Sequence, residues 1–180
     1  MTSYKISPAT EADVPELLSL ILDLDGTSRF TMFHLTLQAV YEKEPDAVVA
    51  TPELMIENVF RKKYAECLIA RKETSDGSKG EAVGLALYFF TYSTWLGIPG
   101  LYLEDLFVKE EHRAQGLGKR LFGELGAIAK ERNCGRVEWR VLKPSIDFYV
   151  ECLKADNLHE WDTMRIEGDE GIERLVAMRK

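Results

Sequence analysis

Two glycines one residue apart, Gly116 and Gly118, stand at the start of a strongly helical run, and Arg113 precedes them by three residues. Glycine is a poor helix former, so its placement here needs an explanation. The first turn of a helix presents unpaired backbone N–H groups and the positive end of the helix dipole, which together attract an anion. Glycines let such a backbone approach a bulky phosphate. Residues 113–118, which we call the phosphate loop, therefore predict a pyrophosphate site.

The short pattern of the phosphate loop is not specific by itself. Lys119 and Arg120 add positive charge beside it, but a Gly-x-Gly pair before a helix is often only a tight turn. The loop lacks the Gly-Lys-Ser/Thr ending of a Walker loop and the third glycine of the dinucleotide-binding fingerprint. A phosphate ligand and a simple turn both stay open on this segment alone.

Composition limits the classes of protein that the chain can belong to. Its 180 residues fit one domain, and its net charge of −7 argues against a general nucleic-acid binder. The acidic excess suits a solvated surface or a cationic substrate equally well. Three scattered cysteines and three scattered histidines show no metal-ligand spacing. Without a signal peptide or an apolar run long enough to span a membrane, we expect a soluble, cytoplasmic protein that uses no metal.

The surrounding sequence predicts the elements that must position the phosphate loop. Three strand-like runs come together in the middle of the chain, which excludes a repeating βαβ unit and favours an α/β (α+β) fold with a mixed sheet covered by helices. We expect a single domain over residues 1–180, with a partly ordered insertion around residues 25–40. Strands are predicted over 4–10, 66–72, 81–93, 100–109, 136–142, 158–168 and 172–180, and helices over 10–24, 51–63, 116–133 and 143–155.

Several ordered motifs resemble one enzyme superfamily. The segment "LEDLFVKEEHRAQGLGKRLF" resembles the acetyl-CoA-binding segment of the GNAT superfamily of N-acetyltransferases, and Arg113, Gly116 and Gly118 match its Arg/Gln-x-x-Gly-x-Gly/Ala signature. The stretches "YFFTYSTWLG", "LYLEDLFV" and "KPSIDFY" look like the diamine (spermidine/spermine) and thialysine acetyltransferase branch. The resemblance covers most of the chain apart from the region around 25–40. It implies a mostly antiparallel sheet splayed at its fourth and fifth strands, acetyl-CoA as co-substrate, a small amine as substrate, and a homodimer.

The resemblance also assigns roles to residues. Amide groups of the phosphate loop would bind the pyrophosphate of coenzyme A, Glu104 would bind the substrate amine or act as its base, and Tyr149 would protonate the leaving thiolate. Attack by the amine would be direct, in a ternary complex. The implied cofactor-binding residues are Leu106, Phe107, Val108, Arg113, Ala114, Gln115, Gly116, Leu117, Gly118, Lys119, Ser145 and Phe148, and the implied substrate-binding residues are Tyr92, Ser93, Trp95, Glu104 and Asp105.

Several of these residues could also have a purely structural role. Glu104 and Asp105 are adjacent acids in an apolar strand, so alternation predicts opposite faces, and both could contact only backbone or surface partners. Tyr149 could be a core tyrosine, and Trp95 could serve core packing rather than cation–π binding of an ammonium. Polyamine-acetylating members tend to carry aspartate where this chain has Ser93, which favours a smaller amine or an amino acid.

The chain departs from the branch just before Pro144. The branch usually reads Asp/Glu-Trp-Asn there, whereas this sequence passes directly from Leu142 to Lys143. About three residues, including an asparagine associated with the coenzyme site, are absent. Two alternatives therefore stand beside a small-amine acetyltransferase: a peptide or protein N-acetyltransferase, and an acyl-CoA-binding protein that has lost catalysis.

Overall fold

The computed structural model of the chain describes residues 2–24, 49–141 and 143–179. The insertion expected around residues 25–40 lies outside the described residues. The chain divides into two compact units, Met1–Leu142 and Lys143–Lys180, which are described separately below.

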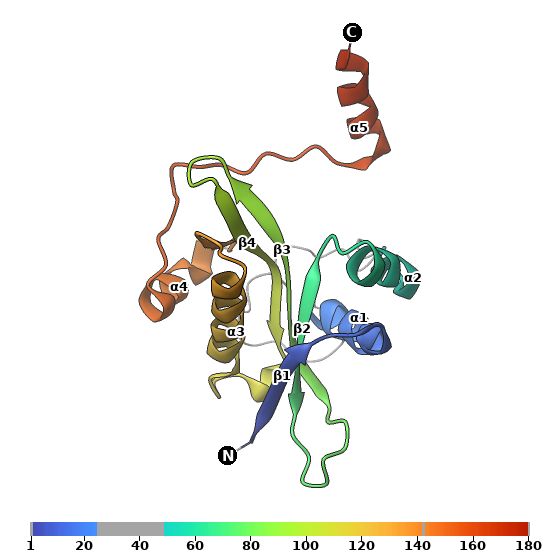
Figure 1. Cartoon of the computed structure of the whole chain (residues 1–180), viewed down its shortest axis with the longest axis vertical. Coiled ribbons are helices and arrows are strands. Elements are labelled where there is room, and N and C mark those ends of the chain that lie inside the picture. The colour runs from blue at the N-terminus through green and yellow to red at the C-terminus, as the bar shows by residue number, and fades with distance from the viewer. Residues whose placement is uncertain (1, 25–48, 142, 180) are drawn as a thin grey trace. The chain divides into compact units, whose positions relative to one another are not determined.

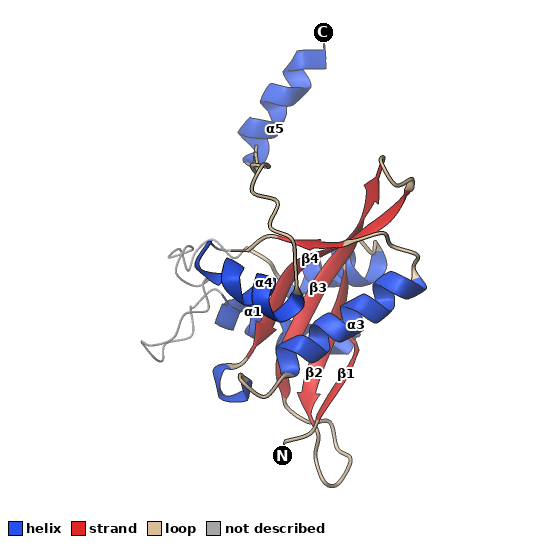
Figure 2. Ribbon diagram, turned by 90° about the vertical axis from the view of Figure 1, so that its left-hand side faces the viewer, coloured by secondary structure: helices blue, strands red, loops and turns tan. Residues whose placement is uncertain are grey.

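The first unit is built on a five-stranded sheet (Figures 1 and 2). Neighbouring strands are antiparallel, except that the last pair is parallel, so the predicted mixed and mostly antiparallel sheet is confirmed. The strands follow one another in sequence order: β1 (Tyr4–Pro8), β2 (Glu66–Lys72), β3 (Ala82–Ser93), β4 (Ile98–Val108) and β5 (Val137–Trp139).

Helices cover both faces of this sheet. Helices α1 (Val14–Leu24) and α2 (Pro52–Met55) lie on one face, and α3 (Leu117–Glu131) lies on the other (Figure 1). Strand β3 is therefore buried on both sides over most of its length, which explains its almost continuous apolar sequence. Leu121 and Leu125 of α3 are fully buried against the sheet, as their helical spacing predicted.

The predicted caps of the first two helices, Thr10 and Thr51, are confirmed. The Asp13 carboxylate accepts hydrogen bonds from the backbone N–H and the hydroxyl of Thr10. The Thr51 hydroxyl accepts from the N–H of Leu54, and Pro52 occupies the first turn. Short turns extend these helices: η1 (Glu11–Asp13) leads into α1, and the π-helical η2 (Ile56–Arg61) continues α2.

A charged network joins α1 to β2. The Arg71 guanidinium holds both carboxylate oxygens of Glu16, at 2.8 and 2.6 Å, and also donates to Asp13 at 2.6 Å. Bidentate pairs of this kind are among the stronger ionic contacts in proteins. The hydrogen bonds from Arg71, helped by Lys79 and opposed by partial burial, lower the pKa of Glu16 to about 2.

The second unit contains α4 (Ile146–Leu153) and α5 (Gly168–Val176), with the short turns η4 (Lys143–Ser145) and η5 (Ala177–Arg179). The predicted helix at 143–155 is confirmed. The two predicted closing strands are wrong, because residues 154–167 form no strand and most of 172–180 is helical. The apolar residues Ile172, Leu175 and Val176 have helical spacing, and the acidic first turn of α5 suits the positive end of a helix dipole.

Candidate active site

Strand β4 carries a β-bulge at its two adjacent acids. Leu103 and Asp105 pair with two consecutive residues of β3, so Glu104 is the extra residue between them. The bulge resets the alternation of the strand: Leu103 before it and Leu106 after it both pack into the core under α3. The prediction that Glu104 and Asp105 point to opposite faces is therefore wrong, because it assumed a regular strand.

The pairing of β4 with β5 ends next to this bulge. Strand β5 pairs with β4 only over Leu101–Leu103 and ends at Trp139, whereas β4 runs on to Val108. The predicted divergence of the fourth and fifth strands stays a prediction, since β5 pairs with β4 over its whole length and then ends; Glu104 is the first residue of β4 beyond the paired segment. An open strand edge offers backbone hydrogen-bonding groups to a ligand.

Beyond the end of β4, the chain forms the phosphate loop through a short turn, η3 (Glu110–His112). Ala114 and Gly116 both adopt the left-handed backbone conformation, with φ of +57° and +80°. The first hydrogen bond of α3 runs from the Arg120 N–H to the Gly116 carbonyl over 3.1 Å. The N–H groups of residues 117–119 precede that bond, so they are the groups that the helix start could offer to an anion.

The two glycines of the loop are required for different reasons. Gly116 needs its positive φ, which a residue with a Cβ adopts only at a cost. Gly118 has no such conformation, and a Cβ built on it would meet nothing within 4 Å. Nothing in the chain itself therefore demands glycine at position 118, which lies in the first turn of α3, where the helix leaves its N–H groups unpaired. This arrangement fits a bulky phosphate group.

The cations of the phosphate loop are partly engaged by the protein itself. Arg113 donates from Nε to the Val108 carbonyl at 2.8 Å, and its guanidinium lies 5.7 Å from the ring centre of Phe107. Arg120 donates to the Tyr4 carbonyl at 2.8 Å. Arg113 thus ties the loop to the end of β4, and Arg120 ties the start of α3 to β1.

Three of the predicted cofactor-binding residues have buried side chains. Phe107 and Val108 are 6% and 9% exposed, and Leu117 is 1% exposed. Any contact that these residues make with a ligand runs through their backbone groups, as expected at a strand edge and at a helix start.

Sequence reasoning missed the neighbours of Glu104. Arg140, just after β5, places Nη2 at 3.8 Å from the Glu104 carboxylate and donates from Nε to the Tyr102 hydroxyl at 2.9 Å. In the sequence, only the position of Arg140 in the predicted strand 136–142 could have pointed to these contacts, because they depend on the pairing of β4 with β5. Glu104 is thus paired with a cation of the chain itself, Arg140.

Asp105 lies on the opposite side of the sheet from α3, close to the buried thiol of Cys67. Burial first, and the negative charge of Asp105 second, raise the pKa of Cys67 to about 12. A thiol with so high a pKa is almost fully protonated at neutral pH, so it is a poor nucleophile.

The predicted substrate-binding residues of the β3–β4 hairpin are not brought to the bulge within this unit. The Ser93 hydroxyl accepts from the Leu96 N–H at 3.2 Å, and Ser93 is buried in the hairpin turn. Tyr92 and Trp95 are 65% and 88% exposed. Ser93 is five positions along β3 from Tyr88, which lies beside the bulge, and this offset spans about 16 Å at ordinary strand rise.

Tyr149, Ser145 and Phe148 belong to the second unit, so their roles at this site stay predictions. Within that unit, the rings of Phe148 and Tyr149 meet edge to face at 5.2 Å. Burial raises the pKa of Tyr149, which keeps its phenol protonated. A protonated phenol is the form that a general acid requires.

Comparison with known proteins shows which family the chain resembles in sequence and in fold. The acetyltransferase (GNAT) family profile matches residues 30–153. Thialysine N-epsilon-acetyltransferase of Sus scrofa is 33% identical over 94% of this chain and 95% of its own. L-ornithine N5-acetyltransferase NATA1 of Arabidopsis thaliana is 37% identical over 48% of this chain and 39% of its own. An integron cassette protein of V. cholerae has a TM-score of 0.70 at 20% identity, covering 97% of this chain and 98% of its own.

The fold and these similarities together define the class of the protein, which is an acetyltransferase. More particularly, the chain belongs to the GNAT acetyltransferase family and is close to thialysine N-epsilon-acetyltransferases. In the part of the chain that the structure describes, no helix is long and apolar enough to cross a membrane, and no group of His, Cys, Asp or Glu is placed to hold a metal ion.

Proposed function

We propose that this acetyltransferase takes its acetyl group from acetyl-CoA and transfers it to the primary amine of a small amine or amino acid of the thialysine, lysine or diamine type. The observation that carries the proposal is the phosphate loop, where Gly118 leaves open space before the free N–H groups of α3. The similar proteins named for thialysine and for L-ornithine support an amino acid with a terminal amine.

The phosphate loop and the open edge of β4 would hold the coenzyme. The N–H groups of residues 117–119 would bind the pyrophosphate, with Lys119 and Arg113 adding positive charge. Backbone groups of β4 beyond Leu103 would bind the extended part of the coenzyme, where β5 no longer pairs with β4. Acetyl-CoA supplies the activated acyl group as a thioester.

Glu104 would receive the substrate ammonium and help it to lose its proton. A free alkyl ammonium has a pKa near ~10.4, so the amine must be deprotonated before it can attack. Glu104 is 41% exposed at its side chain and lies at the opening of the sheet, where a substrate can reach it. Direct attack by the amine is supported by the raised pKa of Cys67, which makes an acyl-cysteine intermediate at this buried thiol unfavourable.

Tyr149 would donate a proton to the departing thiolate, since its raised pKa keeps the phenol protonated at neutral pH.

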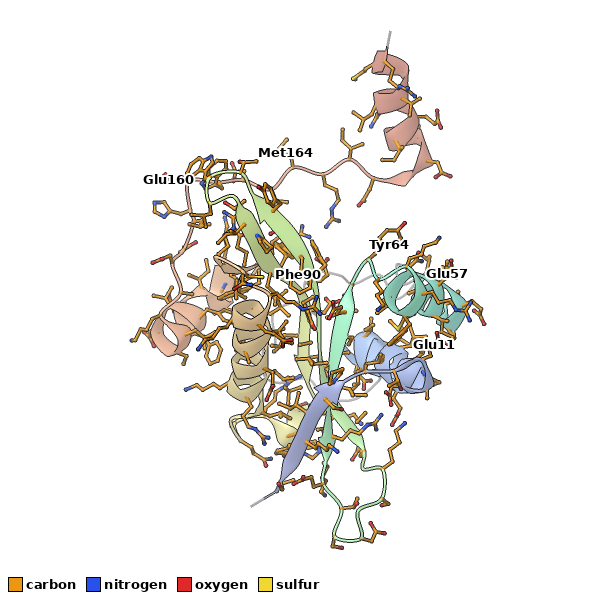
Figure 3. All side chains as sticks on the ribbon, in the orientation of Figure 1. Glu11, Glu57, Tyr64, Phe90, Glu160 and Met164 are labelled. Carbon is orange, nitrogen blue, oxygen red and sulfur yellow. The ribbon has the colours of Figure 1, made fainter. Side chains whose placement is uncertain are left out.

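We also propose a homodimer. Several large apolar side chains of the second unit are exposed, including Trp161 at 71% and Met164 at 90%, and exposed apolar surface of this kind is typical of contact regions. Figure 3 labels Met164. Sedimentation measures the oligomeric state.

A thiol-release assay with acetyl-CoA tests the proposal. Thialysine, lysine, ornithine, spermidine and a test peptide are compared as acceptors for the wild type and for Glu104→Gln. We expect release with the small amines and a strong loss in the variant. Release with the peptide alone would refute the small-amine assignment and favour a peptide or protein N-acetyltransferase.

A second candidate is a protein that binds acyl-CoA without turning it over. The observation that favours it is the missing Asp/Glu-Trp-Asn segment before Pro144, at the point where the structure divides into two units. Coenzyme A binding by calorimetry, together with no thiol release on any of the five acceptors, would establish this alternative.

A further inference from the structure

The phosphate loop is tied to the first strand of the sheet by a buried hydrogen-bond network. Tyr4 of β1 is only 4% exposed, and its hydroxyl lies 2.8 Å from Gln115 Oε1 and 2.9 Å from His112 Nδ1. His112 is also buried, at 8% exposure, and its ring meets the Tyr4 ring edge to face. Gln115 belongs to the loop, and His112 immediately precedes it.

The direction of each hydrogen bond follows from the donors that are present. Gln115 donates from Nε2 to the Glu111 carbonyl at 3.1 Å, so its Oε1 faces Tyr4 and must accept. The single hydroxyl proton of Tyr4 is used in that bond. The contact between Tyr4 and His112 then requires His112 to donate, so its proton must be on Nδ1.

This network surrounds the most strained part of the loop. Ala114 lies between His112 and Gln115 and adopts φ of +57°, a conformation that residues with a Cβ rarely adopt. Such a residue keeps this conformation only when its surroundings hold it there. The side chains of His112 and Gln115, both bound to Tyr4, fix the chain on either side of Ala114.

We infer that Tyr4 is a positioning residue for coenzyme binding: through His112 and Gln115 it holds the phosphate loop in the geometry that presents the N–H groups of α3. The inference rests on the proposed use of acetyl-CoA. Tyr4 does not touch the proposed ligand, and it lies in β1, beside the start of α3 (Figure 1). Preorganisation of this kind strengthens binding because less order has to be gained when the ligand arrives.

The test removes one hydroxyl. Tyr4→Phe deletes both hydrogen bonds and keeps the ring, so we expect the Kd for coenzyme A and the KM for acetyl-CoA to rise by about 5- to 30-fold. The kcat at saturating acetyl-CoA should stay within about twofold, because the loop reaches the same bound geometry once the ligand is present.

Tyr88→Phe is the matched control. Tyr88 is a second buried tyrosine, 3% exposed, whose hydroxyl donates to Glu66 at 3.0 Å, away from the phosphate loop. It should lower the melting temperature as a lost buried hydrogen bond does, without raising the Kd for coenzyme A. Equal Kd values for the wild type and both variants would overturn the inference. No binding of coenzyme A to the wild type would refute the proposed function itself and the inference with it.

A second measurement needs neither turnover nor a variant that folds poorly. The ¹⁵N spectrum of the wild-type imidazoles, with the His112 signals assigned from a His112→Asn variant, shows which ring nitrogen carries the proton. We expect a protonated Nδ1 in His112 without ligand. An unprotonated Nδ1 would overturn the network, because Tyr4 could not then donate to both of its partners.

Discussion

Gly118 allows the sharpest separation of a ligand-binding role from a structural one. Its backbone has no positive φ, and a Cβ there meets nothing within 4 Å. The Cβ that Gly118→Ala and Gly118→Val both add therefore introduces no clash into the free protein. Because glycine is the poorest helix former after proline, both variants should be at least as stable as the wild type.

The substitutions at Gly118 should raise the stability of the protein and lower its affinity for coenzyme A. In a helix interior, alanine is more favourable than glycine by about 1 kcal/mol, and in the first turn we expect about half of that. For a chain of this size, this corresponds to a rise in melting temperature of about 1–2 °C. A valine side chain before the N–H groups of residues 117–119 would remove one or two charge-assisted hydrogen bonds to phosphate, or about 2–4 kcal/mol. The Kd for coenzyme A should then rise by about 30- to 1,000-fold, with alanine between valine and the wild type.

Calorimetric titration with coenzyme A and thermal melting of the same samples measure both effects. Gly123→Ala is the matched control, because Gly123 lies in the same helix and its Cβ also meets nothing within 4 Å. This control should gain similar stability and keep its affinity within about twofold. Unchanged affinity in Gly118→Val would show that the glycine pair is only a turn, and the phosphate site would have to lie elsewhere.

Three further predictions concern catalysis, specificity and stability. Tyr149→Phe should lower kcat by 10²–10⁴-fold, which corresponds to about 3–5 kcal/mol of barrier, and leave the affinity for acetyl-CoA unchanged. Steady-state kinetics measure this change, and a normal kcat would show that Tyr149 is only a core residue. The wild type should have a higher kcat/KM for thialysine than for spermidine, and the opposite preference would contradict this prediction. Ser93→Asp keeps an acceptor for the Leu96 N–H and should shift the ratio of the two kcat/KM values toward spermidine. The pairing with Arg71 lowers the folded-state pKa of Glu16 from 4.5 to about 2, so it contributes stability that is present above pH 4.5 and lost as the pH falls through about 2. Melting curves over this range should show a smaller decline for Glu16→Gln than for the wild type.

Local patterns predicted most of the first unit. The apolar spacing in α3 and the caps at Thr10 and Thr51 depend on neighbours within a few residues, and the structure confirms them. The closing strands failed because the apolar residues of 172–180 suit a half-buried strand or an amphipathic helix equally well. Strand β5 is only three residues long, although the predicted strand covers residues 136–142, since strand length depends on the partner strand.

The candidate site could be predicted only as far as its local parts. The glycine pair and the adjacent acids are visible in the sequence, whereas the bulge at Glu104 is a property of the register between two strands. The hydrogen bond between Tyr102 and Arg140 spans 38 residues, and that between Tyr4 and Gln115 spans 111. No periodicity or short motif encodes contacts over such distances, because they arise from the packing of the sheet.

The two glycines of the phosphate loop differ in whether the conformation of the chain explains them. Gly116 is explained by the chain alone, because its φ of +80° would exclude most other residues whether or not a ligand binds. Gly118 is not explained by the chain, since its backbone is helical and the space beside it is open. Gly123 lies in equally open space in the same helix, so what sets Gly118 apart is its place in the first turn, beside the N–H groups that the helix leaves unpaired. The sequence shows both residues as the same letter, so only their conformation and surroundings distinguish the turn at Gly116 from the phosphate contact that we propose for Gly118.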